Sequence, residues 1–210
     1  MNVIARWAHL LFGITWLGLL YYFNFVQGGY FKTASKEGLR GVEAKLAPKA
    51  LWWFRWGAML TFLAGVYLLW EVGALFNDYI VLGALMGTFM FLNVWLVIWP
   101  AQQIAIGMKK GDGAEAGAKA MLASQTNLLF SVPMAYCMFS SAHKGYAPEH
   151  LLSGFNASGV DTGLFIALAI IVLLELNAVF GKHGPLKTIK GAIHMSMLLT
   201  ASLIMSLVYI

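Results

Sequence analysis

Six long apolar stretches limit how this chain can fold more than any other feature. A helix needs about 20 mostly apolar residues to cross the hydrocarbon core of a bilayer. Stretches of that length occupy about residues 4–27, 51–72, 79–100, 121–142, 161–181 and 189–210. The chain is 60% hydrophobic and 11% charged, whereas soluble domains contain about 25% charged residues. The pattern predicts an all-α polytopic membrane helical bundle of about six transmembrane helices, with residues 1–210 forming a single transmembrane domain.

The segments between these stretches differ in character. The first stretch is too long for a signal-peptide core and no small-residue cleavage site follows it, so we expect a retained span. Residues 28–50 form a polar loop whose part from Ser35 to Ala47 has the spacing of a short surface helix. Residues 101–120 continue the third helix and then break at Gly111-Asp112-Gly113.

The positions of the basic residues predict the orientation. Cytoplasmic loops carry an excess of Lys and Arg. The side opposite the N-terminus holds 12 of the 14 basic residues, and only Arg6 and Lys144 fall on the side of the N-terminus. We therefore expect both termini on the non-cytoplasmic side of the membrane. The same distribution explains the net charge of +5 without a nucleic-acid partner.

Two histidines fall at a similar depth on the side of the termini. His9 lies near the start of the first stretch, and His143 follows the fourth. Two imidazoles from different helices at one depth are what axial ligation of a haem iron requires. Gly13 lies one turn from His9 on the same face and would leave room for a porphyrin, and Arg6 lies one turn away on the other side, where it would meet a propionate. The alternative is that both are interfacial histidines that bind headgroups or backbone.

Few other ionisable residues lie in the apolar stretches. His194 has no obvious partner except His183 or Gln125, so a second haem is a weaker hypothesis. Glu175 is expected to pair with Arg55, with a proton path as the alternative. The single cysteine, Cys137, excludes an internal disulfide.

Three patterns concern packing rather than chemistry. Asn93 and Asn127 are expected to make interhelical hydrogen bonds. Gly83 and Gly87 form a small-xxx-small pair, which favours close helix approach. The aromatic run from Leu51 to Trp56 indicates an interfacial belt.

Four segments, in order, resemble the membrane (N-terminal) domain of the bacterial membrane-bound urate oxidases, or urate hydroxylases. They are Arg6–Gly18, Phe54–Gly65, Gly83–Gln102 and Asn127–His143. The resemblance implies a haem b cofactor and carries the family's histidines onto His9 and His143. It also implies an outward C-terminus, on which relatives carry a cytochrome c domain.

This chain departs from the family pattern at several points. It contains no Cys-x-x-Cys-His motif, so we expect a short form without the cytochrome c domain. Two further family histidines correspond to positions near Val81 and Gln125, and the chain is about two spans shorter. Urate as the substrate is therefore not carried over.

Two functions follow from these observations. The first is a haem b redox protein that transfers electrons, or uses them for oxidation, near the periplasmic face, with a periplasmic electron carrier or a larger membrane complex as partner. The second is a structural or accessory subunit of a respiratory or photosynthetic complex, without catalysis of its own. Paired histidines favour electron transfer, since oxidation needs an open axial position.

Overall fold

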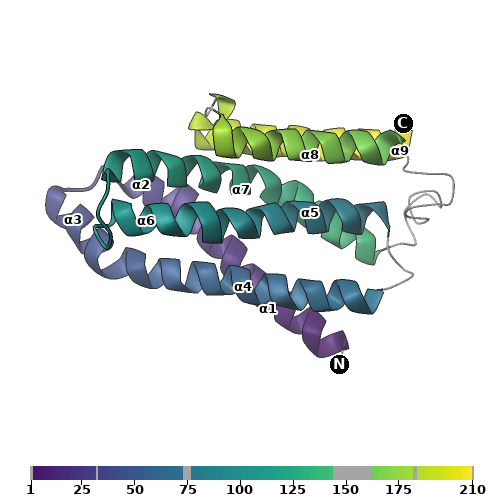
Figure 1. The fold of residues 1–210 in the computed structure, drawn as a ribbon, viewed down its shortest axis with the longest axis horizontal. Coiled ribbons are helices and arrows are strands. Elements are labelled where there is room, and N and C mark those ends of the chain that lie inside the picture. The colour runs from purple at the N-terminus through teal and green to yellow at the C-terminus, as the bar shows by residue number, and fades with distance from the viewer. Residues whose placement is uncertain (1, 32, 73–76, 144–161, 182–183, 210) are drawn as a thin grey trace.

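A computed structural model describes residues 2–31, 33–72, 77–143, 162–181 and 184–209. The described residues form long helices that run side by side along one axis (Figure 1). Their elements are α1 (Asn2–Tyr21), η1 (Tyr22–Gln27), α2 (Gly28–Tyr30), α3 (Lys36–Gly41), η2 (Val42–Leu46), α4 (Ala47–Val72), α5 (Asp78–Leu92), η4 (Asn93–Ile98), α6 (Trp99–Ala105), α7 (Gly113–Ala142), α8 (Thr162–Phe180), η7 (Gly184–Lys187) and α9 (Ile189–Tyr209).

The described part of each apolar stretch is helical, apart from Gly181 at the end of one, and the described residues include no strand. The all-α prediction is therefore confirmed. Three helices are long and apolar enough to cross a membrane, namely Val3–Tyr30, Asp78–Ala105 and Ile189–Val208, and Thr162–Asn177 is a shorter apolar helix. The chain accordingly has the character of a membrane protein, while the count of six spans stays a prediction.

Three of the long helices contain a wide, π-helical turn. The segments η1 and η4 lie within the first and third helices, and η2 joins α3 to α4 without a break. The predicted surface helix at residues 35–47 is thus helical but runs directly into the second apolar helix. Ser35 begins it, because its Oγ accepts a hydrogen bond from the backbone N–H of Gly38 at 3.2 Å.

The chain breaks between the two helices as predicted, but at residues 106–112 rather than 111–113, because α6 already ends at Ala105 and α7 begins at Gly113. The Asp112 carboxylate accepts backbone hydrogen bonds from Ala114 at 2.8 Å and Glu115 at 3.2 Å. This cap supplies partners for the first N–H groups of α7. Residues 113–120, which we expected in the loop, are therefore the first two turns of α7.

The core of the bundle is built around α7. This helix packs against α5, α6, α8, α9 and part of α1, and its middle is buried from Gln125 to Ser131. Gly83 of α5 faces it closely, since a Cβ there would lie 3.3 Å from the Cβ of Cys137. Gly87 has nothing within 4 Å of such a Cβ, so only the first glycine of the predicted pair allows close approach.

Helix α1 joins this core only through its C-terminal half, where Trp16 and Leu20 are buried. It crosses obliquely behind α4, its main neighbour (Figure 1). Only 11% of the most apolar window of its helix is buried within the structure. Apart from Arg6, its exposed side chains are apolar, among them Val3, Trp7 and Leu10.

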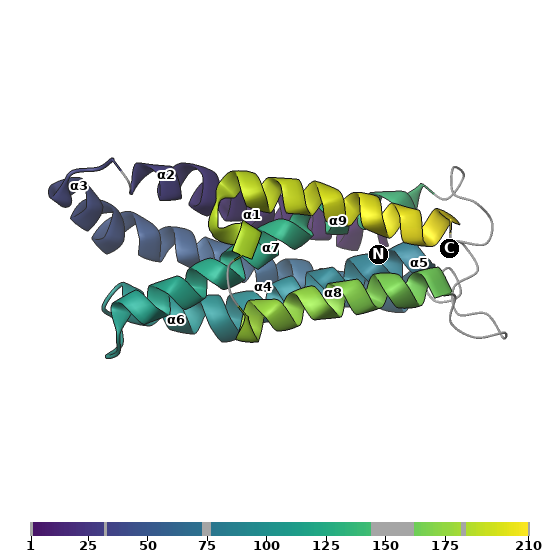
Figure 2. The same ribbon diagram turned by 90° about the horizontal axis from the view of Figure 1, so that it is seen from above.

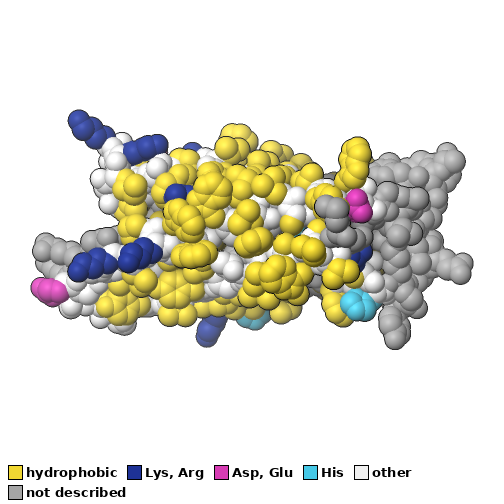
Figure 3. All heavy atoms as spheres, turned by 90° about the horizontal axis from the view of Figure 1, so that it is seen from below, with side chains coloured by type: hydrophobic (Ala, Val, Ile, Leu, Met, Phe, Trp, Pro, Cys, Tyr) yellow, Lys and Arg dark blue, Asp and Glu magenta, His cyan; other side chains and the backbone are white. Residues whose placement is uncertain are grey.

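The two ends of the bundle differ in charge. Both termini lie at one end, and α3 and the turns that precede α7 and α9 lie at the other (Figures 1 and 2). Hydrophobic side chains cover the middle of the face in Figure 3, and most Lys and Arg side chains gather toward the end with α3. Trp52, Trp53 and Trp56 are exposed beside Lys49, as expected of an interfacial belt. The residues Lys144, His150 and His183 lie outside the part of the chain that the structure describes.

Candidate functional site

Hydrogen bonds between α1 and α7 fix the relative depth of the two predicted haem ligands. The Tyr21 hydroxyl donates to Ser131 Oγ at 3.1 Å. His9 lies 12 residues before Tyr21 on a helix that starts at the end with the termini, and His143 lies 12 residues after Ser131 on a helix that finishes there. Each histidine is therefore displaced about 18 Å along its helix toward the same end. Both histidines therefore lie toward the end of the bundle that holds the termini, and their common depth stays a prediction.

His9 lies in the interface between α1 and α4. Its ring is half-buried, and Nδ1 is 2.9 Å from the carbonyl oxygen of Thr61. A carbonyl oxygen only accepts hydrogen bonds, so Nδ1 carries the proton and donates it. Nε2 is then left as the unprotonated nitrogen with a lone pair, which is the form that coordinates a metal ion.

Glycines make room for this imidazole. A Cβ on Gly65 would lie 3.0 Å from His9 Cε1, so the ring rests directly over a residue without a side chain. About two turns away on α4, a Cβ on Gly57 would lie 3.3 Å from the backbone nitrogen of Trp16. On α1, a Cβ on Gly13 would lie 3.8 Å from Thr61 Cγ2. The backbones of α1 and α4 approach closely because these positions are small.

The other two predicted haem contacts on α1 have different surroundings. The Gly13 side of the helix is bordered by Thr61 of α4, and Arg6 lies on the exposed part of the first helix. The role of Gly13 beside a porphyrin and the role of Arg6 toward a propionate stay predictions.

His143 is exposed at the end of α7. Its Nδ1 lies 2.9 Å from the carbonyl oxygen of Phe139, one turn earlier, and its ring stacks on Phe139 with centroids 4.1 Å apart. The same argument places the proton on Nδ1 and leaves Nε2 available. His143 thus bonds within its own helix. Among the described residues, no hydrogen bond or ring contact joins it to His9.

His194 shows the same local pattern at the opposite end. Its Nδ1 lies 2.7 Å from the carbonyl oxygen of Lys190, and its side chain is exposed. Gln125, the other polar residue considered near that depth, is 3% exposed, and its Oε1 is buried without a hydrogen-bond partner among the described residues. Of the three histidines that the structure describes, His9 and His143 are the two that share an end of the bundle.

A polar cluster within the apolar part of the bundle differs from the prediction. Glu175 Oε2 accepts a hydrogen bond from Asn93 Nδ2 at 3.1 Å, and the same Nδ2 lies 3.0 Å from Asn127 Oδ1. The prediction that Asn93 and Asn127 make interhelical hydrogen bonds is confirmed, and they bond to each other. The pairing of Glu175 with Arg55 is not formed, because the Arg55 guanidinium lies 3.8 Å from the centre of the Trp99 ring instead.

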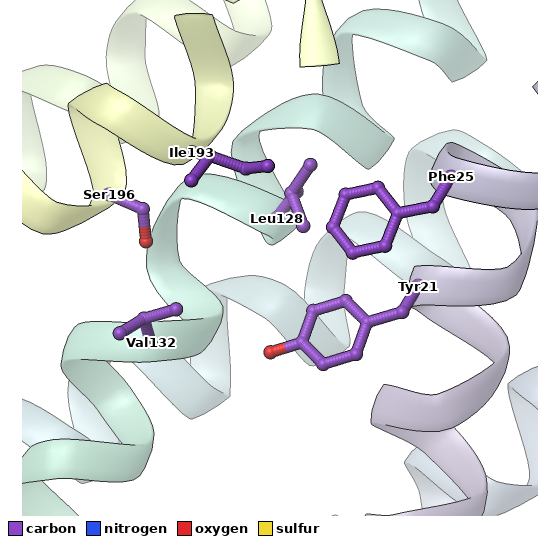
Figure 4. A pocket seen from close by; sticks show the side chains of 6 residues that line it. All are labelled: Tyr21, Phe25, Leu128, Val132, Ile193 and Ser196. Atoms are coloured by element: carbon purple, nitrogen blue, oxygen red, sulfur yellow. The ribbon is translucent and has the colours of Figure 1, made fainter. Parts of the chain in front are cut away.

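A small crevice opens between α1 with η1, α7 and α9 (Figure 4). Its volume is about 200 Å³, and it is lined by Tyr21, Phe25, Leu128, Val132, Ile193 and Ser196. The lining is apolar apart from hydroxyl groups that are already hydrogen-bonded, since Ser196 donates to the carbonyl of Leu129 at 2.7 Å. No histidine lines this crevice, so it is separate from the pair described above.

Comparison with known proteins supports the resemblance derived from the sequence. The family model described as "Urate oxidase N-terminal" matches residues 70–153. That range contains Gly83, Asn93, Asn127 and His143, and it begins after His9. No match was found among curated proteins or among solved structures.

Proposed function

We propose, from the similarity of residues 70–153 to the urate oxidase N-terminal family, that this chain is a haem b-binding redox protein of a bacterial inner membrane. It would cross the membrane about six times with both termini in the periplasm. Electron transfer, or oxidation of a substrate, would take place near the periplasmic face. The cofactor follows from what the resemblance in the sequence implies, and the distribution of charge supports the orientation.

The orientation rests on the basic end of the bundle. Described lysines with exposed side chains lie at or near the end opposite the termini, and they are Lys45, Lys49, Lys109, Lys110, Lys119, Lys187 and Lys190. At the end with the termini, the described basic residue is Arg6. An excess of this kind marks the cytoplasmic side.

The haem proposal rests on two histidines that lie toward the same end of the bundle and share the same tautomer. His9 and His143 each donate Nδ1–H to a backbone carbonyl and keep Nε2 available. Metal-binding histidines are usually oriented in this way, because the second nitrogen fixes the ring and the tautomer. The proposal accordingly assigns the iron-binding nitrogens to Nε2 of His9, on α1, and Nε2 of His143, at the end of α7.

Each residue would have a separate task. His9 and His143 would supply the axial nitrogens, Arg6 would offset the charge of a propionate, and Gly13 would leave space along α1. A bound haem supplies one-electron redox chemistry, and two histidine ligands favour electron transfer over reactions that need an open position. The expected partner is a periplasmic electron carrier or a membrane complex.

The optical spectrum of the purified protein tests this proposal. We expect a Soret band and an α band that appears on reduction with dithionite. His9→Ala and His143→Ala should each lower the haem content or change the coordination, because each removes one axial nitrogen. His194→Ala is the matched control, since this exposed histidine has the same backbone bond at the opposite end.

Two results would refute the assignment. A wild-type protein purified from haem-replete cells without a Soret band would exclude haem b. Unchanged spectra in both His9→Ala and His143→Ala would exclude these residues as ligands even if haem is present. Absence of haem, together with constant co-purification of other subunits in mild detergent, would favour the accessory-subunit hypothesis.

A further inference from the structure

Glu175 stands alone as a charged residue in a long apolar helix. It is half-buried on α8, and it is the only charged residue between Thr162 and Phe180. Its single hydrogen-bond partner among the described residues is Asn93. The haem proposal gives this carboxyl group no task.

The surroundings of Glu175 are hydrocarbon on the outer side. Val172 and Leu176 of the same helix are 39% and 48% exposed, and Leu96, one turn beyond Asn93, is 67% exposed. Exposed leucines and valines at one level of a membrane protein are expected to face lipid. Asn93 itself lies about 22 Å from the start of α5 and about 18 Å from the end of α6, so the carboxyl group lies near the middle of that helix.

The two asparagines have a defined orientation. Asn127 Nδ2 donates to the carbonyl oxygen of Met90 at 2.9 Å, which turns Asn127 Oδ1 toward Asn93. Asn93 must therefore present its NH₂ group, and the two hydrogens go to Asn127 and Glu175. Asn93 and Asn127 are 2% and 0% exposed, so packing holds this arrangement in place.

Among the residues that the structure describes, no cation interacts with the carboxyl group of Glu175. Helix α8 packs against α5, α7 and α9. The charged or titratable residues of these three helices, together with His143 at the C-terminal end of α7, are Asp78, Tyr79, Glu115, Lys119, Tyr136, Cys137, His143, Lys190, His194 and Tyr209. None of those that the structure describes interacts with Glu175. Arg55, the partner expected from the sequence, contacts Trp99. An unpaired carboxylate is costly in hydrocarbon, whereas the neutral acid needs only hydrogen bonds.

We propose that Glu175, Asn93 and Asn127 form a proton-binding site within the membrane. Glu175 holds the proton on its carboxyl group, and Asn93 donates to Oε2 and fixes the orientation of that group. Asn127 in turn fixes Asn93. The ligand is a proton rather than a metal cation, because the group aimed at Glu175 is an N–H donor, which would repel a cation. Asn93 also begins the π-helical segment η4, a type of turn that is frequent at functional sites.

Infrared spectroscopy and chemical labelling test this site at neutral pH. The wild-type protein should show the carbonyl stretching band of a protonated carboxylic acid, and Glu175→Gln should remove it. The band should shift in D₂O, because a working site exchanges its proton. A hydrophobic carbodiimide, which reacts with protonated carboxyl groups, should label Glu175 as identified by mass spectrometry.

Two variants serve as controls. Glu115→Gln changes an exposed carboxylate in the first turn of α7 and should leave the band and the labelling of Glu175 unchanged. Asn93→Leu removes the donor, so it should move the band to the frequency of a free acid while the labelling of Glu175 persists. This variant keeps the carboxyl group, so it separates loss of hydrogen bonding from loss of the acid.

Three outcomes would overturn the proposal. One is an infrared spectrum in which Glu175→Gln leaves the carbonyl stretching region of protonated carboxylic acids unchanged. Another is absence of a carbodiimide adduct on Glu175 in folded protein. The third is a band that does not respond to D₂O, which would identify a sealed structural acid.

Discussion

The contact between α1 and α4 gives a prediction whose size follows from the structure. A Cβ on Gly57 would lie 3.3 Å from the Trp16 nitrogen, 3.4 Å from Thr15 Cγ2 and 3.6 Å from the Phe12 oxygen. Two of these atoms belong to the backbone of α1, so a rotamer change cannot relieve the contact. Gly57→Leu should therefore push the two helices apart.

The expected cost has two parts. Overpacking of a tight contact costs about 1–3 kcal/mol. Separation of the helices also breaks the bond between His9 and the Thr61 carbonyl, which contributes about 1 kcal/mol. Together these terms lower the free energy of unfolding by about 2–4 kcal/mol, before the gain in helix propensity when leucine replaces glycine.

The matched control for this change is Gly18→Leu. Gly18 is an exposed residue of α1 with nothing within 4 Å of an added Cβ, so leucine there gains the same propensity without the clash. Reversible unfolding in mixed SDS micelles, followed by tryptophan fluorescence, compares the two variants. We expect Gly57→Leu to unfold at a lower SDS fraction and also to bind less haem. Equal unfolding midpoints would refute the close contact between α1 and α4.

Two further predictions concern single residues. Arg55→Ala removes the cation from the Trp99 ring and should lower the free energy of unfolding in the same micelles by about 0.5–2 kcal/mol. It should leave the infrared band of Glu175 unchanged. Asp112→Ala removes the cap of α7 and should cost about 1 kcal/mol; Asp112→Asn, which keeps an acceptor oxygen, should recover most of that loss.

The sequence predicted the helices well because one physical requirement determines them. A run of about 20 apolar residues has no stable alternative to a helix in lipid, since every backbone group must be hydrogen-bonded within the segment. The start of α7 was the clearest error. Residues 113–120 carry Glu115 and Lys119, so the helix extends beyond the apolar stretch, where hydropathy gives no signal.

The partner of Glu175 could not be predicted in the same way. Arg55 and Asn93 both lie in apolar stretches, and composition favours the opposite charge. The choice depends on which faces of the helices meet. Helix α4 supplies Arg55 but packs mainly on α1, whereas α5 packs on both α7 and α8. Only the arrangement of the helices places Asn93 beside both Asn127 and Glu175.

The site at the histidines was predicted in part. Their common depth follows from counting residues along two helices of opposite direction, and the bond between Tyr21 and Ser131 agrees with that count. The carbonyl partners of Nδ1 were not predictable, because Thr61 faces His9 only through the close approach at Gly57 and Gly65.

The proton site and the histidine pair should respond to mutation independently. Asn127 and His143 lie on the same helix 16 residues apart, which corresponds to about 24 Å. Residues separated by more than about 10 Å without shared partners usually have additive effects. Glu175→Gln should thus leave the haem spectrum unchanged, and His9→Ala should leave the infrared band of Glu175 unchanged. If either variant altered the signal of the other site, the two would be coupled through α7, the helix that supplies both His143 and Asn127.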